Sequence, residues 1–118
     1  LGCGRLFEGT PDQMWDTMQR FRALPDDTMV CSGHEYTQSN GAFALTIEPD
    51  NADLQTRITD VRAKRAQGLP TVPSLLSIEK RTNPYLRADL PALKTALGMK
   101  NASDIEVFAE IRHRKDVF

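Results

Sequence analysis

Residues 31–40, CSGHEYTQSN, stand where the character of the chain changes. Residues 28–32, which run into this stretch, are mostly apolar and partly β-branched, and this favours a short strand. After Tyr36 the apolar residues recur at helical spacing to the end of the chain. We therefore predict two parts, an α/β part over residues 1–36 and an all-helical part over residues 37–118.

The composition is that of a globular protein and argues against several classes. The 118 residues fit one compact domain or a piece of a larger protein. Fifteen Lys and Arg against sixteen Asp and Glu give a formal net charge of −1, so neither nucleic acid nor a membrane is an expected partner. No membrane span or signal peptide is predicted. Cys3 and Cys31 make no disulfide framework, which favours a reduced, cytoplasmic protein.

The chain opens on Leu1 rather than on Met, without a polar leader. Gly2 and Gly4 on either side of Cys3 are typical of a tight exit from a strand. We expect that strand to lie upstream, and we therefore expect the chain to be truncated.

The first part contains a helix with a clear start. The segment TPDQ at residues 10–13 combines an N-cap threonine, a proline at the first helical position and a capping-box glutamine. Met14, Met18 and Phe21 then follow at i, i+4 and i+7 and predict the buried stripe. The strand at residues 28–32 belongs to a sheet whose neighbours are missing, so we expect unpaired edges on both of its sides.

The second part reads as a series of capped helices. Ser39 and Asn40 are expected to cap a short helix. Asp50 or Asn51 caps the clearest helix of the chain, and Gly68 ends it. Its predicted buried stripe consists of Leu54, Ile58 and Val61. The same rules predict helical turns over residues 75–81 and a helix from Asp89 to Gly98. A last helix starts at Ser103 and turns Ile105, Phe108 and Ile111 inward.

His34 is the first candidate for chemistry. A lone Gly-His-Glu after a strand is compatible with a metal ligand, but a hydrogen bond within the loop explains it at least as well. The other histidine, His113, lies among the cations of residues 112–115, which disfavours a metal there. The chain contains no H-x-x-x-H, C-x-x-C or H-E-x-x-H motif. Spacing alone therefore gives no complete metal site.

Arg112 and Lys115 form the densest positive patch and, three residues apart, share one helix face. Such a pair can clamp a carboxylate or a phosphate, although the residues alone favour a solvated helix end that complements the helix dipole. Arg5 is a surface arginine, or an anion contact if the turn at Gly4 lines a cleft. No G-x-S-x-G elbow surrounds Ser32, so nucleophilic catalysis has little support.

Four segments of the sequence are most informative when they are considered together. Together, in this order, they resemble the C-terminal part of the glyoxalase II (hydroxyacylglutathione hydrolase) family, and the resemblance covers essentially the whole chain: LGCGRLFEGTPDQMW at 1–15, CSGHEYTQSNGAFALTIEPDN at 31–51, TVPSLLSIEKRTNPYLR at 71–87 and FAEIRHRKDVF at 108–118.

The resemblance implies a fold and a reaction. Members of this family have a metallo-β-lactamase-like αββα domain with two divalent metals, usually zinc and sometimes iron or manganese, followed by a helical domain. They hydrolyse S-D-lactoylglutathione to D-lactate and glutathione. The implied fold of this chain is mainly α: the helical domain over residues 37–118, preceded by an α/β remnant of the metal domain over residues 1–36.

The resemblance also implies site residues, which this chain would use to hold substrate and metal rather than to catalyse. They are His34 as the last metal-binding histidine, Tyr36 as an aromatic lining the glutathione pocket, Arg5 as a basic residue contacting the substrate, Arg112 and Lys115 as the cations that hold a glutathione carboxylate, and Phe7 where some members have a tyrosine.

The family's T-H-x-H-x-D-H motif is missing from this chain. We therefore predict no catalytic residue here, no stably bound metal and no thioesterase activity of the chain alone, with the missing N-terminal half of the enzyme as a partner. The alternative is a non-catalytic helical module that binds glutathione or a protein. A helix-turn-helix nucleic-acid binder using residues 112–115 is disfavoured by the net charge.

Overall fold

The computed structural model describes residues 1–118 and is mainly helical, which confirms the predicted fold class. Its elements, in chain order, are α1 (Pro11–Arg22), β1 (Met29–Val30), α2 (Thr37–Ile47), α3 (Ala52–Ala66), β2 (Ser74–Leu75), α4 (Leu76–Thr82), the 3₁₀ turn η1 (Pro84–Leu86), α5 (Pro91–Ala96) and α6 (Asp104–Asp116). None of these helices is long and apolar enough to cross a membrane.

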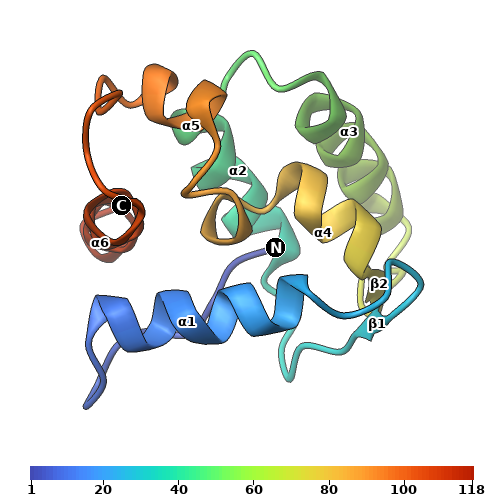
Figure 1. The fold of residues 1–118 in the computed structure, drawn as a ribbon. Coiled ribbons are helices and arrows are strands. Elements are labelled where there is room, and N and C mark those ends of the chain that lie inside the picture. Colours follow the sequence, from blue (N-terminus) through green and yellow to red (C-terminus); the bar gives the residue numbers. More distant parts are fainter.

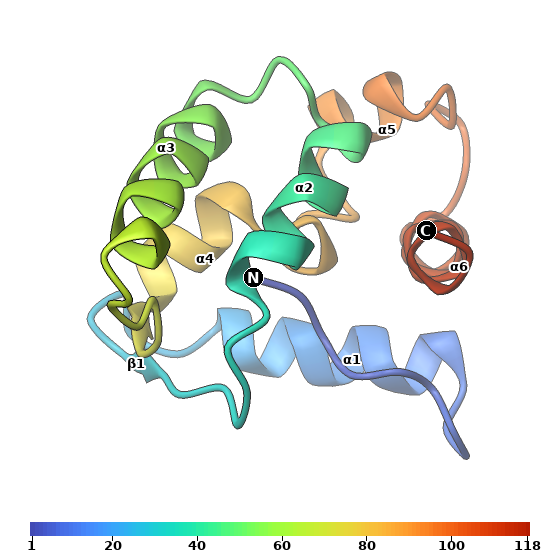
Figure 2. The same cartoon turned by 180° about the vertical axis from the view of Figure 1, so that it is seen from behind.

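The helices surround one main core and one smaller core. In Figures 1 and 2, α3 and α6 lie on opposite sides of the molecule, with α2 and α4 between them and α1 along one edge. The main core collects residues from α1, α2, η1 and α6, among them Trp15, Phe43, Tyr85 and Phe108. Ala44 of α2 joins the second core with residues of α3. Helix α2 therefore links the two cores.

Close packing of α2 on α3 depends on a glycine. A Cβ atom built on Gly41 would collide with the side chain of Ile58. Because interiors are packed at crystal-like density, Ile58 could give way only by disturbing its neighbours. Gly41 therefore sets the distance between these two helices.

Helix ends that depend on local capping residues agree with the predictions from the sequence. Thr10 and Ser103 start α1 and α6 with complete capping boxes. The side chain of Asn51 accepts a hydrogen bond from the backbone of Leu54 at the start of α3. Gly68, with a φ of +70°, closes α3 in the conformation that favours glycine. Each signal acts within four residues, so sequence alone could reveal it.

Two predicted caps are wrong because tertiary partners take the side chains. Helix α2 begins at Thr37, so Ser39 and Asn40 lie inside it, and the amide of Asn40 donates to the carbonyl of Leu1 (2.7 Å). Helix α5 begins at Pro91. Asp89 instead accepts two hydrogen bonds from Arg22 of α1, at 2.6 and 2.7 Å.

Two predicted core positions are also wrong. Phe21 is 52% exposed and Ile105 is 43% exposed. Helix α1 buries Met18, as predicted, together with Trp15 in place of Phe21. Helix α6 buries a face that includes Arg112. The period of 3.6 residues allows neighbouring faces with similar apolar content, and contact between α1 and α6 selects which one is buried.

The strand of the first part has a partner within the chain. Strand β1 pairs antiparallel with β2, with Met29 opposite Leu75 and Val30 opposite Ser74. The expectation of unpaired edges on both sides is therefore wrong for one edge. The extended residues before α4 provide the pairing, and it ties the first part to the helical part.

Replacing Leu54 or Ile58 by alanine is expected to lower the free energy of unfolding by about 2–5 kcal/mol, because each leaves a cavity in a buried site. Urea denaturation followed by circular dichroism measures the change. Thr56→Ala, on the exposed side of α3, is the control and should change the stability by less than about 0.5 kcal/mol. Costs near zero at both core sites would contradict the packing of α3.

Candidate functional site

All six residues that the sequence nominates line one open cavity of about 870 Å³. Its walls come from the N-terminal segment, the loop before α2, the start of α2 and the last turns of α6. The residues are Arg5, Phe7, His34, Tyr36, Arg112 and Lys115. Positions more than a hundred residues apart in the chain therefore meet at one surface.

The N-terminal segment is held between α2 and α6. Figure 2 shows it running from the middle of the molecule across α1 and then turning back into the start of α1. Gly2 has a φ of +104°, and a Cβ there would collide with Asn40. The carbonyl of Gly2 accepts a hydrogen bond from the side chain of Asn83 (3.0 Å). Glycine at position 2 thus lets the segment turn toward the cavity.

Arg112 is built into this wall. It is 5% exposed. Its Nη1 donates to the carbonyls of Cys3 (3.1 Å) and Gly4 (3.4 Å), and its Nη2 donates to Asp116 (2.9 Å). The guanidinium also lies 5.3 Å from the ring centre of Tyr85. Its Nε is buried and has no hydrogen-bond partner, so one donor of this guanidinium is unsatisfied within the protein.

Lys115 and Arg5 add two more cations. The Nζ of Lys115 lies 5.4 Å from the ring centre of Phe43 and 4.9 Å from that of Phe118. Burial lowers the pKa of Lys115, and repulsion from Arg112 and Arg5 lowers it further. Arg5 is largely exposed, with its Nε 3.9 Å from the carboxylate of Asp116. Three cations therefore face the cavity around a single carboxylate.

Sequence reasoning missed Asp116. This residue lies four positions after Arg112 on α6, a spacing at which opposite charges pair on a helix surface. That spacing was the signal that could have identified it. Its carboxylate partly offsets the positive charge of the cavity.

His34 and Tyr36 contribute an aromatic part of the cavity lining. Their rings stack, with centres 5.3 Å apart and planes inclined by 21°. Between them, the carboxylate of Glu35 accepts hydrogen bonds from the backbone N–H (2.5 Å) and the hydroxyl (2.7 Å) of Thr71, and these bonds lower the pKa of Glu35. The loop that carries both rings is thereby fastened to the segment before β2.

The chain offers neither a complete metal site nor an activated thiol. Nowhere do three His, Cys, Asp or Glu side chains gather closely enough to hold an ion. His34 is thus a single donor, and the residues of this chain alone do not fit a two-metal centre. Cys3 lines the cavity, but burial raises the pKa of its thiol to about 11, so the thiol stays protonated at neutral pH.

Comparison with known proteins gives one consistent result. The family described as "Hydroxyacylglutathione hydrolase C-terminus" matches residues 35–118. Over all 118 residues the chain is 64% identical to a hydroxyacylglutathione hydrolase of Ruegeria pomeroyi, and 56% identical to those of Maricaulis maris and Methylococcus capsulatus. Each alignment covers the whole of this chain but 46% of the relative's length. The chain therefore belongs to the hydroxyacylglutathione hydrolase family, whose C-terminal region it matches.

Proposed function

We propose that the cavity binds the glutathione part of a glutathione thioester, within an enzyme that hydrolyses S-D-lactoylglutathione to D-lactate and glutathione. The observation that carries this proposal is the meeting of Arg5, Arg112 and Lys115 with the stacked rings of His34 and Tyr36 around one cavity. The relatives are named as hydroxyacylglutathione hydrolases, which supports the class of substrate.

The charges of the cavity suit glutathione, which carries two carboxylates. Arg5, Arg112 and Lys115 line the cavity together, and their charges can attract a ligand carboxylate. Lys115, one turn further along α6, can contact the same group. Tyr36 and Phe7, which also line the cavity, offer exposed rings to the aliphatic parts of the ligand. Because Phe7 lacks a hydroxyl, it can contribute only such contacts.

We assign the hydrolytic step to parts of the enzyme that this chain does not span. In this proposal two divalent metals, zinc or else iron or manganese, activate the attacking water, and His34 is one of their ligands. Residues 1–36 then belong to the metal-binding domain and residues 37–118 to a helical domain that holds the substrate. The remaining part of the enzyme is the partner of this chain, and the cytoplasm is its compartment.

A second candidate is a binding module without catalysis. The observation that favours it is the absence of any group of three metal-ligating side chains. Both candidates require the cationic cavity, so glutathione binding by the chain alone supports either. They differ in whether adding the rest of the relatives' length produces thioester hydrolysis.

Lys115→Met is expected to weaken glutathione binding by about 10- to 100-fold, because one charge-assisted hydrogen bond contributes about 1.5–3 kcal/mol. The measurement is a titration of the 118-residue chain with glutathione at millimolar concentrations, followed by NMR.

Lys100→Met is the matched control, because Lys100 is exposed and does not line the cavity. Its affinity for glutathione should equal that of the unchanged chain. Equal affinities for the Lys115 and Lys100 variants would reject the cation cluster as the glutathione site.

A further inference from the structure

Lys115 is flanked by two aromatic rings of different origin. Phe43 is a core residue of α2, whereas Phe118 follows α6 and is 62% exposed. The two rings meet edge to face, with centres 5.5 Å apart. The Nζ of Lys115 lies within cation–π distance of both rings.

The side chain of Phe118 contacts Phe43 and Lys115 but is not part of the hydrophobic core. It belongs to neither hydrophobic core, and the aromatic ring it packs against is that of Phe43. The nearer of the two cation–π contacts of Lys115, at 4.9 Å, is the one to Phe118. A lysine side chain has four freely rotating bonds, so an unheld ammonium group would spread over many positions.

We propose that Phe118, together with Phe43, is a positioning residue that holds the ammonium group of Lys115 at the cavity for an anionic ligand. This inference rests on the proposed function, because the ligand is taken to be the carboxylate of glutathione. Phe43 forms the fixed floor of this aromatic cradle, and Phe118 closes it from the solvent side. Neither ring touches the ligand in this arrangement.

The aromatic cradle can be tested without a ligand. Ring currents of Phe43 and Phe118 should shift the Nζ-side methylene protons of Lys115 upfield in the NMR spectrum. Phe118→Leu, which keeps an apolar side chain but removes the ring, should lose most of the shift, and Phe118→Tyr should retain it. Thermal unfolding of all three proteins should coincide, because position 118 is exposed. An unshifted Lys115 in the unchanged chain would overturn the proposal.

A double-mutant cycle tests whether Phe118 acts through Lys115. Phe118→Leu should weaken glutathione binding by about two- to fivefold, the range of an exposed cation–π contact, and Phe118→Tyr should restore it. In the Lys115→Met background, Phe118→Leu should have no effect. The same loss in both backgrounds would overturn the proposal. If glutathione fails to bind the unchanged chain while the upfield shift is present, the proposed function fails and the aromatic cradle stands.

Discussion

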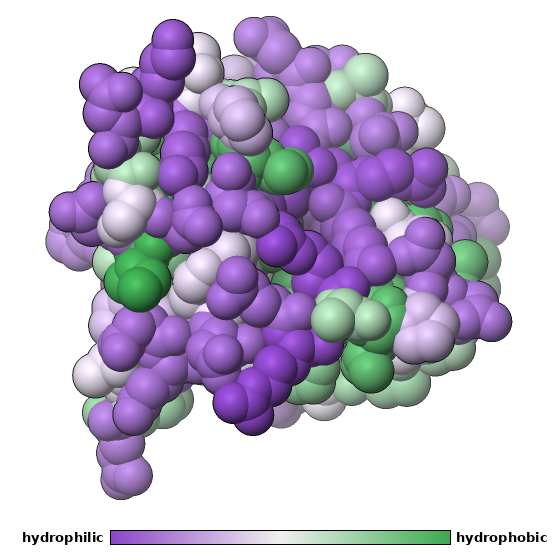
Figure 3. Space-filling view, viewed as in Figure 1, coloured by the Kyte–Doolittle hydropathy of each residue, from purple (hydrophilic) through white to green (hydrophobic).

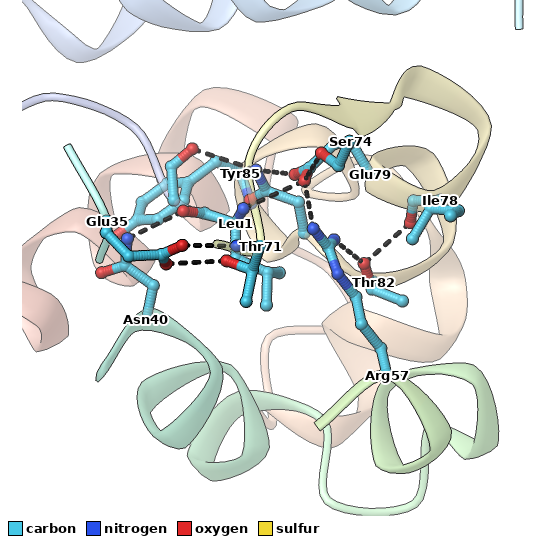
Figure 4. Close-up of polar contacts among 12 residues, drawn as sticks. Leu1, Glu35, Asn40, Arg57, Thr71, Ser74, Ile78, Glu79, Thr82 and Tyr85 are labelled. Atoms are coloured by element: carbon cyan, nitrogen blue, oxygen red, sulfur yellow. Dashed lines mark hydrogen bonds and ion pairs between the residues drawn. The ribbon is translucent and has the colours of Figure 1, made fainter. Parts of the chain in front are cut away.

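Replacing Glu79 by alanine is expected to lower the free energy of unfolding by about 3–5 kcal/mol, because one partner of a buried ion pair is removed. The Glu79 side chain is 2% exposed. Its carboxylate accepts hydrogen bonds from Arg57 (2.5 Å), the amino group of Leu1 (3.0 Å), Ser74 (2.8 Å) and Asn83 (3.0 Å). Figure 4 shows these groups converging from the N-terminal segment, α3 and the region of β2 and α4. Without the carboxylate, the guanidinium of Arg57, which is 9% exposed, stays in the protein without its counter-charge.

The same carboxylate makes stability depend on pH in a predictable direction. In the 118-residue chain, where Leu1 carries a free amino group, burial alone would raise the pKa of Glu79, but the ammonium group of Leu1 and the guanidinium of Arg57 outweigh it and lower the pKa from 4.5 to about 2. A group with a lowered folded pKa stabilises the protein fully above its unfolded value and loses that effect as the pH falls toward the folded value. The unchanged chain should therefore lose stability between pH 4.5 and about 2, and the Glu79→Ala variant should lack this component.

Urea denaturation at several pH values, followed by the fluorescence of Trp15, measures both effects. Glu8→Gln is the control, since Glu8 is exposed and takes part in no ion pair, and it should alter the stability at neutral pH by less than about 0.5 kcal/mol. A loss below about 1 kcal/mol for Glu79→Ala, or an unchanged pH profile, would show that the carboxylate does not hold these segments together.

Glu79 also shows why sequence reasoning succeeded locally and failed at long range. Helix α4 was predictable as helical turns, but it buries Glu79 and Thr82 along with Leu76, where periodicity would place polar residues in solvent. The positively charged groups that stabilise the buried carboxylate, the amino group of Leu1 and the guanidinium of Arg57, lie 78 and 22 residues away in the sequence. Caps and glycine stops, in contrast, act over three or four residues and were correct at Thr10, Asn51 and Ser103.

The candidate site likewise has one part that local sequence spacing predicts and another part that depends on distant contacts. The pairing of Arg112 and Lys115 on one helix face follows from their spacing. Their meeting with Arg5 and His34 does not, because it depends on how the N-terminal segment passes between α2 and α6, and only the family resemblance nominated these residues together. Surface hydropathy does not mark the site either. The face in Figure 3 is mainly hydrophilic, and its hydrophobic residues are scattered rather than gathered in one patch.

The 118-residue chain is expected to release no D-lactate from S-D-lactoylglutathione above the uncatalysed rate, even when zinc, iron or manganese is added. Its residues form no group of three metal ligands, and the thiol of Cys3 is protonated at neutral pH. We therefore expect no metal-activated water and no attack by the Cys3 thiol in this chain by itself. Joined to the rest of the length found in its relatives, it should hydrolyse the thioester, and the two preparations should differ by about 10⁶-fold or more, as enzyme and solution rates do. Release of free thiol and of D-lactate measures both rates.

The controls separate a missing nucleophile from a misfolded protein or an empty cavity. The isolated chain must keep its helical circular dichroism and its Lys115-dependent affinity for glutathione while it is inactive. In the joined protein, His34→Ala should abolish most of the rate, whereas Lys115→Met should mainly raise KM, because in the proposed site the lysine would contact a part of the substrate remote from the thioester. D-lactate released by the isolated chain, free of full-length enzyme, would mean that these 118 residues contain a catalytic group not identified in the cavity. A joined, folded and metal-loaded protein without turnover would instead favour the non-catalytic binding module.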